Sequence, residues 1–271
     1  MPTRHTGLLP APDANSDAQA RLNATFWARG EQVDEYANRE LRPVEAMLLD
    51  RYREALTGRV LELGCGAGRL TGFLCEISDG VHGLDISPAM VAYCQGAFPN
   101  ASFSVLDLRD LGGFEDAAFE VVFAPFNVLD VLGDDERRAE LEAIRRIISP
   151  GGLLILSSHN RAYAPSIAKP TQLSFASKRE LLESVIYMPR RVRNRRRLRP
   201  LEQQQADYAI LNDDAHDFSI LHYYIGRDAQ ERQLAETGYE LLGCFDLDGA
   251  EVLAGQDAAT CAELHYVALR A

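Results

Sequence analysis

The residues of this chain that could bind a small molecule begin with a glycine-rich turn. Residues 62–68 read Glu-Leu-Gly-Cys-Gly-Ala-Gly, directly after an apolar run. Glycines permit a tight turn and a bare backbone, against which a nucleoside can lie beside the next helix. Asp85 follows 21 residues after Gly64 and ends a second apolar run, 81–85. A carboxylate there can accept hydrogen bonds from both ribose hydroxyls, so the pattern indicates a ribose-bearing cofactor.

The spacing of the glycines separates this turn from that of nicotinamide enzymes. The dinucleotide fingerprint G-x-G-x-x-G needs a third glycine where this chain has Arg69. Here the glycines stand at alternate positions, and an acid, Glu62, lies two residues before the first of them. The spacing therefore favours a nucleoside cofactor other than NAD.

The turn resembles motif I of the class I S-adenosylmethionine-dependent methyltransferases, and the resemblance runs from about residue 30 to the C-terminus. Four later segments fit that family in order: the ribose loop 85–90, the third strand 103–108, the fourth strand and cofactor loop 120–127, and the turn into the fifth strand 149–156. The resemblance implies a Rossmann-like α/β fold with a doubly wound, mostly parallel seven-stranded sheet and an antiparallel last strand. It also implies S-adenosylmethionine as cofactor and S-adenosylhomocysteine as product.

The same resemblance assigns cofactor contacts. It places Glu62, Gly64, Cys65 and Gly66 at the methionine moiety, Asp85 at the ribose, Ile86, Met90, Asp107 and Leu108 at the adenine, and Ala124 and Asn127 beside the sulfonium. An N-terminal helical segment in this family covers the cofactor, so Tyr36 and Arg42 could touch its methionine end. The alternative is that these two are an ordinary packed tyrosine and an exposed arginine of an amphipathic helix.

Alternating helical and strand patterns extend along the chain, as a doubly wound sheet requires. We expect two helices within 23–57, broken near Pro43, and further helices over 68–76, 87–98, 134–148 and 227–236. The closing strands are predicted at 239–247 and 264–269. The predicted organisation is a flexible tail over 1–22 and one domain over 23–271, with 159–225 inserted to cover the substrate.

Methyl transfer to a hydroxyl needs a base, and histidine is the usual choice because its pKa lies near working pH. His159 is the best candidate, since it follows Ser157 and Ser158 at the carboxyl end of the fifth strand. Alternatively, it fixes the turn into the insertion together with Asn160. Asp130, in the loop after the fourth strand, could lie beside the substrate or cap a helix.

The insertion carries two strand-like runs, 207–211 and 217–225, which we interpret as a hairpin with a turn around 212–214. His222 and Tyr224 share one face of the second run and could contact the substrate, although strand aromatics also serve as packing. His216 and His222 have no third metal ligand at a sensible spacing, so no metal site is predicted.

Seven arginines fall within residues 190–199. Arginine binds phosphates and carboxylates in bidentate fashion, so this cluster could hold a phosphorylated or nucleotide-linked substrate. A basic loop paired with acidic surface is the alternative.

The composition of the chain limits the classes of function that are open to it. The chain has 271 residues, 46% of them hydrophobic, and a net charge of −12, which argues against a broad nucleic-acid or membrane-binding surface. No apolar stretch reaches the roughly 18 residues of a membrane span, and the five cysteines form no C-x-x-C pair, so a cytoplasmic protein is expected.

The favoured function is methyl transfer from S-adenosylmethionine to an oxygen or nitrogen of a small molecule, such as a sugar or specialised metabolite. The alternatives are a protein that binds S-adenosylmethionine without catalysis, and an RNA methyltransferase. The oligomeric state is not indicated.

Overall fold

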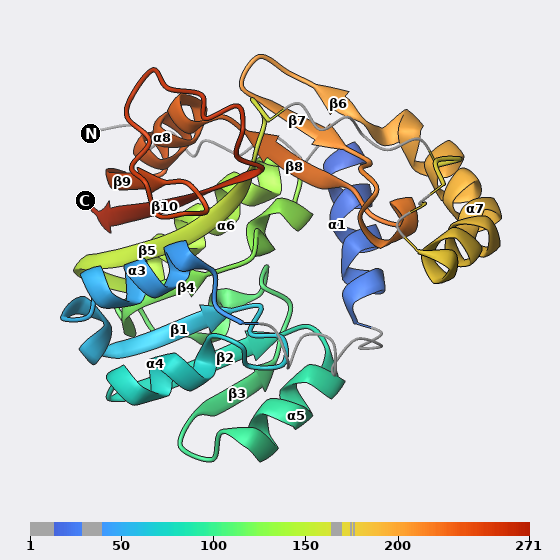
Figure 1. Ribbon diagram of the computed structural model, residues 1–271. Helices are drawn as coiled ribbons and strands as arrows, with labels where there is room; N and C mark the ends of the chain where they lie inside the picture. Colours follow the sequence, from blue (N-terminus) through green and yellow to red (C-terminus); the bar gives the residue numbers. More distant parts are fainter. Residues whose placement is uncertain (1–13, 29–39, 164–169, 174, 176) are drawn as a thin grey trace, which may run out of the picture.

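Five parallel strands form the centre of the sheet in the computed structural model, which describes residues 14–28, 40–163, 170–173, 175 and 177–271. They lie in the order β3-β2-β1-β4-β5 (Figure 1). Their bounds are β1 (Arg59–Leu63), β2 (Gly80–Asp85), β3 (Ser102–Val105), β4 (Phe119–Ala124) and β5 (Ile148–Asn160). Strands β1 and β4 are buried on both faces over most of their length, and their sequences are mainly apolar.

Two further strands complete the predicted seven-stranded arrangement. β10 (Glu263–Arg270) runs antiparallel to β5 on one side and to β9 (Tyr239–Phe245) on the other. The predicted doubly wound fold with an antiparallel last strand is therefore confirmed.

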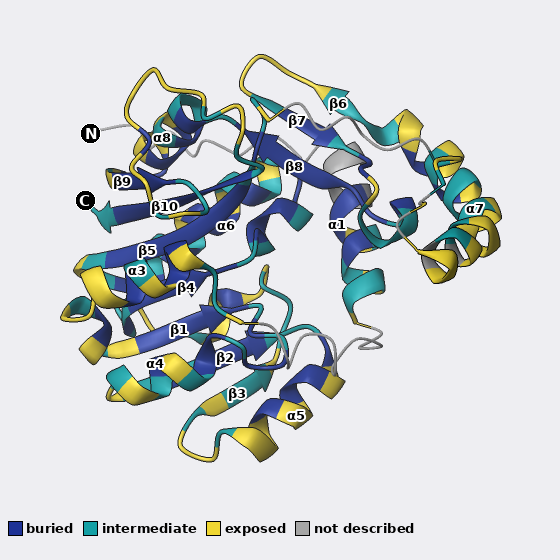
Figure 2. Ribbon diagram, in the orientation of Figure 1, coloured by how far each residue is buried: buried dark blue, intermediate teal, exposed yellow. Residues whose placement is uncertain are grey.

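Helices cover both faces of the sheet. The α-helices are α1 (Ala14–Trp27), α3 (Pro43–Arg51), α4 (Thr71–Ile77), α5 (Pro88–Ala97), α6 (Asp134–Ile147), α7 (Lys178–Leu198) and α8 (Arg227–Glu236). Short 3₁₀ segments are η1 (Ala55–Thr57), η2 (Leu111–Gly113), η3 (Val128–Val131), η4 (Arg199–Leu201) and η5 (Ala215–Phe218). Neighbouring residues of β1 point to opposite faces, so Val60 packs with Leu48 and Leu74 whereas Leu61 packs with Leu141 and Ile144. Figure 2 shows the sheet buried between these layers.

Three more strands extend the sheet beyond the end of β4. β8 (His222–Ile225) pairs in parallel with the last residues of β5, β7 (Tyr208–Leu211) pairs with β8, and β6 (Gln203–Gln204) pairs with β7. The predicted β7–β8 hairpin forms, but its second strand begins at His222. The prediction of a strand over 217–221 is wrong, because the Asn212 amide donates to the carbonyls of Phe218 and Ile220 and stabilises the turns of η5 and the residues after it. The limits 159 and 225 of the insertion stay a prediction.

Helix α1 corrects the prediction for the N-terminal segment. A flexible tail through residue 22 is wrong for residues 14–22, which are helical; residues 1–13 lie outside the described residues. Asn23 anchors the helix, since its buried amide donates to the carbonyls of Val131 and Leu221, each at 2.8 Å. Gln19 donates similarly to the Leu132 carbonyl. Buried polar groups need such partners, so α1 is part of the domain.

The seven-arginine cluster lies mainly in helix α7, at the outer end of the extension (Figure 1). It is a helix and not a basic loop, because one face is anchored: Leu198 and Asn194 are buried, and Arg195 pairs with Glu202. No described helix is both long and apolar enough to cross a membrane.

Candidate active site

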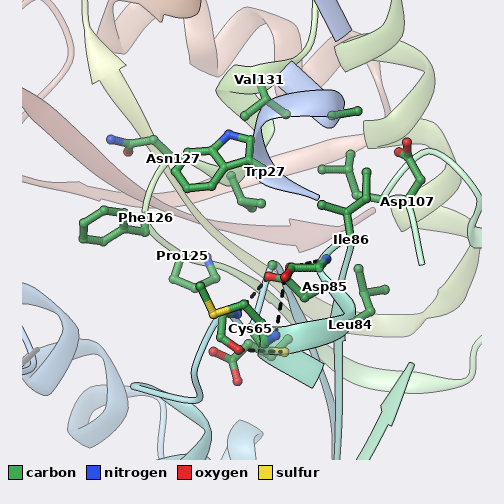
Figure 3. A pocket seen from close by; sticks show the side chains of 18 of the residues that line it. Trp27, Cys65, Leu84, Asp85, Ile86, Asp107, Pro125, Phe126, Asn127 and Val131 are labelled. Carbon is green, nitrogen blue, oxygen red and sulfur yellow. Dashed lines mark hydrogen bonds between the residues drawn. The ribbon is translucent and has the colours of Figure 1, made fainter. Parts of the chain in front are cut away.

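A cavity of about 270 Å³ opens at the carboxyl ends of β1, β2, β4 and β5. Ligands of open α/β sheets bind at this edge. One side of the cavity is formed by the glycine turn and Asp85, and another by α1 and η3; Figure 3 shows Cys65 and Asp85 facing Trp27 and Val131 across it. His159 and His222 also line the cavity, so one space joins the predicted cofactor residues to the predicted catalytic ones.

The glycine turn is built from left-handed backbone. Gly64 and Gly66 have φ of +63° and +54°, values that residues with a Cβ rarely adopt. A Cβ on Gly64 would lie 2.5 Å from a methyl carbon of Val128, whereas a Cβ on Gly66 would meet nothing within 4 Å. Because Gly66 also lines the cavity, its missing side chain keeps space open for a ligand.

Asp85 is held rigidly above this turn. One carboxylate oxygen accepts from the Gly66 amide at 2.9 Å and the other from the Ser87 amide at 2.8 Å. Burial raises the pKa of Asp85, while the two amide hydrogen bonds act in the opposite direction. The oriented carboxylate retains acceptor capacity for two hydroxyl groups.

Two other acids of the cavity wall have partners of their own. Burial raises the pKa of Glu62 to about 7, although the Thr71 hydroxyl donates to it at 2.6 Å. Asp107 accepts two side-chain hydrogen bonds from Arg109, which keep the pKa of Asp107 below its usual value.

Most of the predicted cofactor residues line the cavity. They are Glu62, Gly64, Cys65, Gly66, Asp85, Ile86, Met90, Asp107, Leu108 and Asn127. Arg42 and Ala124 do not: Arg42 pairs with Glu263 behind the wall and stacks on Phe126, and Ala124 is buried in the core. Tyr36 lies outside the described residues.

His159 is oriented by a buried carboxylate. Its Nδ1 lies 2.7 Å from Oδ2 of Asp130, which also accepts from the His159 backbone amide at 2.7 Å. An ionised carboxylate only accepts, so Nδ1 carries the proton and Nε2 is left as the basic nitrogen. The other oxygen of Asp130 accepts from Ser158 and from Arg137, each at 2.7 Å. Asp130 is therefore neither a helix cap nor a cavity residue; it holds His159 from behind.

Arg137 neutralises this carboxylate inside the protein. Both side chains are fully buried. The remaining guanidinium donors reach Gln233 at 3.1 Å and Gln230 at 2.9 Å, and the ring of Tyr223 stacks on the guanidinium. A buried ion pair with hydrogen bonds from all three guanidinium nitrogens is a rigid support for the imidazole.

Asn127 faces the basic nitrogen of His159. The Asn127 amide nitrogen lies 3.4 Å from His159 Nε2 and donates to Glu263 at 2.6 Å. Its oxygen is buried and has no hydrogen-bond partner among the residues that the structure describes. Because Asn127 lines the cavity, a ligand could supply the missing donor.

His222 has a carboxylate partner that sequence reasoning missed. Its Nδ1 lies 2.7 Å from Oδ2 of Asp213, and the Tyr224 hydroxyl donates to the same oxygen at 2.6 Å. His222 lines the cavity, whereas Tyr224 lies behind it. Ligand atoms of His159, Asp213 and His222 lie within 4.8 Å of one another, a grouping that could hold a metal ion. The sequence prediction paired His222 with His216 and did not consider Asp213.

Other cavity residues also escaped sequence reasoning. Trp27, Ala20 and Ala24 come from α1, and Arg69 is held by an ion pair with buried Glu45. The segment before residue 23 carries only a weak helical pattern, so α1 left little signal in the sequence. None of the seven clustered arginines lines the cavity.

Comparison with known proteins agrees with this geometry. Residues 60–152 match the family model described as a methyltransferase domain. The ubiquinone biosynthesis O-methyltransferase of Xanthomonas oryzae pv. oryzae (strain PXO99A) is 28% identical over 153 residues, covering 55% of this chain and 62% of that protein. YqeM of Bacillus subtilis (strain 168), named as a methyltransferase, is 29% identical over 107 residues, covering 38% of this chain and 43% of that protein.

A solved structure shares the fold over nearly the whole chain. The 1,6-didemethyltoxoflavin-N1-methyltransferase of Burkholderia thailandensis, with bound 1,6-didemethyltoxoflavin and S-adenosylhomocysteine, has a TM-score of 0.59 at 16% identity and covers 97% of this chain and 93% of its own. The chain spans less than two thirds of the length of the two curated relatives. The family resemblance predicted from the sequence is confirmed.

Proposed function

We propose that this chain, which carries a class I S-adenosylmethionine-dependent methyltransferase domain, transfers the methyl group of S-adenosylmethionine to a hydroxyl oxygen of a small molecule. One observation carries the proposal. A single cavity contains both the glycine turn with Asp85 and a histidine whose Nδ1 is held by a buried carboxylate.

The residues of the cavity fit the cofactor. The open space at Gly66 and the fixed carboxylate of Asp85 suit an adenosyl ribose. Ile86, Met90 and Leu108 supply apolar contacts for an adenine, and the unpaired oxygen of Asn127 suits a donor of the amino acid part or of the acceptor.

The protein has few tasks in such a reaction. Bound S-adenosylmethionine supplies an electrophilic methyl group on a sulfonium. The chain must align the acceptor, exclude water and remove the hydroxyl proton. Nε2 of His159 takes that proton, Asp130 stabilises the resulting imidazolium, and α1 closes the cavity beside it.

A small acceptor suits the cavity better than RNA does. The clustered arginines of α7, the strongest basic feature, are absent from the cavity wall. A sugar, phenol or specialised metabolite with a free hydroxyl is the proposed class of acceptor.

Asp85→Ala is expected to weaken binding of S-adenosylmethionine at least about 100-fold, because it removes the acceptor for two hydroxyl hydrogen bonds and releases the Gly66 amide. Calorimetric titration with S-adenosylmethionine, S-adenosylhomocysteine and NAD measures this. The wild-type protein should bind the two adenosyl ligands and not NAD. Asp79→Ala, at the exposed residue just before the same strand, is the matched control. Binding of NAD alone would disprove the proposed cofactor.

The rate should rise with pH through the pKa of His159, because the base must be unprotonated. Burial alone would lower this pKa, but the carboxylates of Asp130, Asp213 and Glu263 outweigh it and raise the pKa above the ordinary 6.5. The rising limb of kcat/KM should therefore lie above pH 6.5. Asp130→Asn removes the nearest charge, so the limb should move to lower pH. An unchanged limb in this variant would assign the titration to another group.

A further inference from the structure

Two imidazole–carboxylate pairs lie side by side at one end of the cavity. The first is His159 with Asp130 and the second is His222 with Asp213, and in each the Nδ1 to carboxylate oxygen distance is 2.7 Å. The two imidazole rings are 4.7 Å apart between centroids and inclined by 31°. The mechanism proposed above uses only the first pair.

These hydrogen bonds determine which nitrogen of each imidazole can accept a hydrogen bond from a ligand. Because Nδ1 of each ring donates to a carboxylate, Nε2 of each neutral ring remains as the acceptor; at His159 it has only the long contact of 3.4 Å from the Asn127 amide. Both histidines line the cavity. A ligand that satisfies both nitrogens must therefore bring two donors, held close together on one rigid frame.

Both carboxylate oxygens of Asp213 already accept hydrogen bonds. Oδ2 of Asp213 accepts from both His222 and the Tyr224 hydroxyl, and its Oδ1 accepts from the Ala215 amide at 3.1 Å. A metal ion bound by Asp213 at Oδ2 would compete with the two side-chain hydrogen bonds. The geometry therefore favours a role for Asp213 in orienting His222, and it disfavours a role as a metal ligand.

The cavity wall beside His222 is apolar. Asn23 of α1 donates to the carbonyl of Leu221, the residue before His222, and so fixes α1 against this strand. Ala20, Ala24 and Trp27 of the same helix line the cavity. These side chains offer contact surface to a hydrocarbon ring and few hydrogen bonds to a sugar.

We propose that the acceptor is an aromatic ortho-diol, which presents one hydroxyl to His159 and the neighbouring hydroxyl to His222. This inference rests on the proposed function and names its substrate class. The oxygen facing His159 forms a bond to the methyl carbon as the carbon–sulfur bond breaks; the electron pair stays on sulfur and the hydroxyl proton passes to Nε2 of His159. His222 accepts from the second hydroxyl and determines specificity.

Matched aromatic alcohols test the proposal. Catechol, resorcinol and phenol, together with 2,3-dihydroxynaphthalene and 2-naphthol, are assayed with S-adenosylmethionine by release of S-adenosylhomocysteine, in the presence of EDTA. We expect kcat/KM for each ortho-diol to exceed that of its single-hydroxyl analogue about 10- to 100-fold, since the analogue leaves a buried acceptor unpaired. Resorcinol, whose hydroxyls are further apart, should behave like phenol.

His222→Gln should reduce the ratio of ortho-diol to mono-ol kcat/KM to within about threefold of unity, a readout that a general loss of stability would not move. His82→Gln, at a histidine of β2 that does not line the cavity, is the control and should retain the wild-type ratio. A wild-type ratio in His222→Gln would overturn the inference.

Three further outcomes would also overturn it. Methylation of mono-ols and diols at equal rates would leave the proposed function intact but would show that His222 makes no contact with a second hydroxyl. Turnover that EDTA abolishes and Zn²⁺ or Mg²⁺ restores makes the histidine cluster a metal site. Absence of methylation of every ortho-diol, in a protein that binds S-adenosylmethionine by calorimetry, excludes this acceptor class while the cofactor assignment stands.

Discussion

His159→Ala is expected to lower kcat by about 10²- to 10⁴-fold, the contribution typical of a positioned general base. The affinity for S-adenosylmethionine should stay within about threefold of wild type, because the imidazole acts on the acceptor hydroxyl. Single-turnover kinetics, with calorimetry for the cofactor, separate the two quantities. The expectation follows from the fixed tautomer of His159, whose Nδ1 is held by Asp130, whose Nε2 is the basic nitrogen, and whose side chain lines the cavity.

The control for this variant is His82→Ala, which removes a half-buried imidazole from β2 outside the cavity. It should retain wild-type kcat. Full activity of His159→Ala on the physiological acceptor would refute the general-base role. Loss of cofactor binding in His159→Ala would instead show that the histidine shapes the adenosyl site.

Arg137→Met is expected to destabilise the protein by about 3–5 kcal/mol, because it leaves the carboxylate of Asp130 buried without a countercharge. The methionine replaces most of the packing volume, so the lost ion pair should dominate the effect. Urea denaturation monitored by circular dichroism measures the change in the free energy of unfolding.

The neighbouring arginine provides the matched control. Arg138 lies on the same helix, but its ion pairs with Asp134 and Glu236 are partly exposed, so Arg138→Met should cost no more than about 1 kcal/mol. Adding Asp130→Asn to Arg137→Met should recover part of the loss, since it removes the unpaired charge. Equal destabilisation by the two arginine variants would contradict the role given to the buried pair.

The sequence determined the central fold and one side of the site, because both depend on short segments. Apolar runs mark the parallel strands, and alternate glycines at 64, 66 and 68 specify the turn after β1. Asp85 could be assigned since it ends the neighbouring strand, and carboxyl ends of parallel strands meet at one edge. Helix α8 was likewise predicted at its observed bounds.

The second strand of the hairpin and helix α1 were predicted poorly for a common reason. Residues 217–221 have the composition of a strand, but side-chain hydrogen bonds from Asn212 hold the loop in another conformation. The segment before residue 23 is only weakly amphipathic, and its helix is anchored by Asn23 and Gln19 on distant carbonyls. Tertiary contacts overrode local propensity in both segments.

The chemistry of the acceptor side was decided by tertiary structure. From the sequence, His159 and Asp130 were separate candidates with alternative roles, and Asp213 was not a candidate at all. Only the fold brings Asp130 under His159, Arg137 against Asp130, and Asp213 beside His222. Periodicity along the chain specifies which face of an element is buried, but hydrogen bonds between elements depend on how these pack, and such packing leaves no local pattern in the sequence.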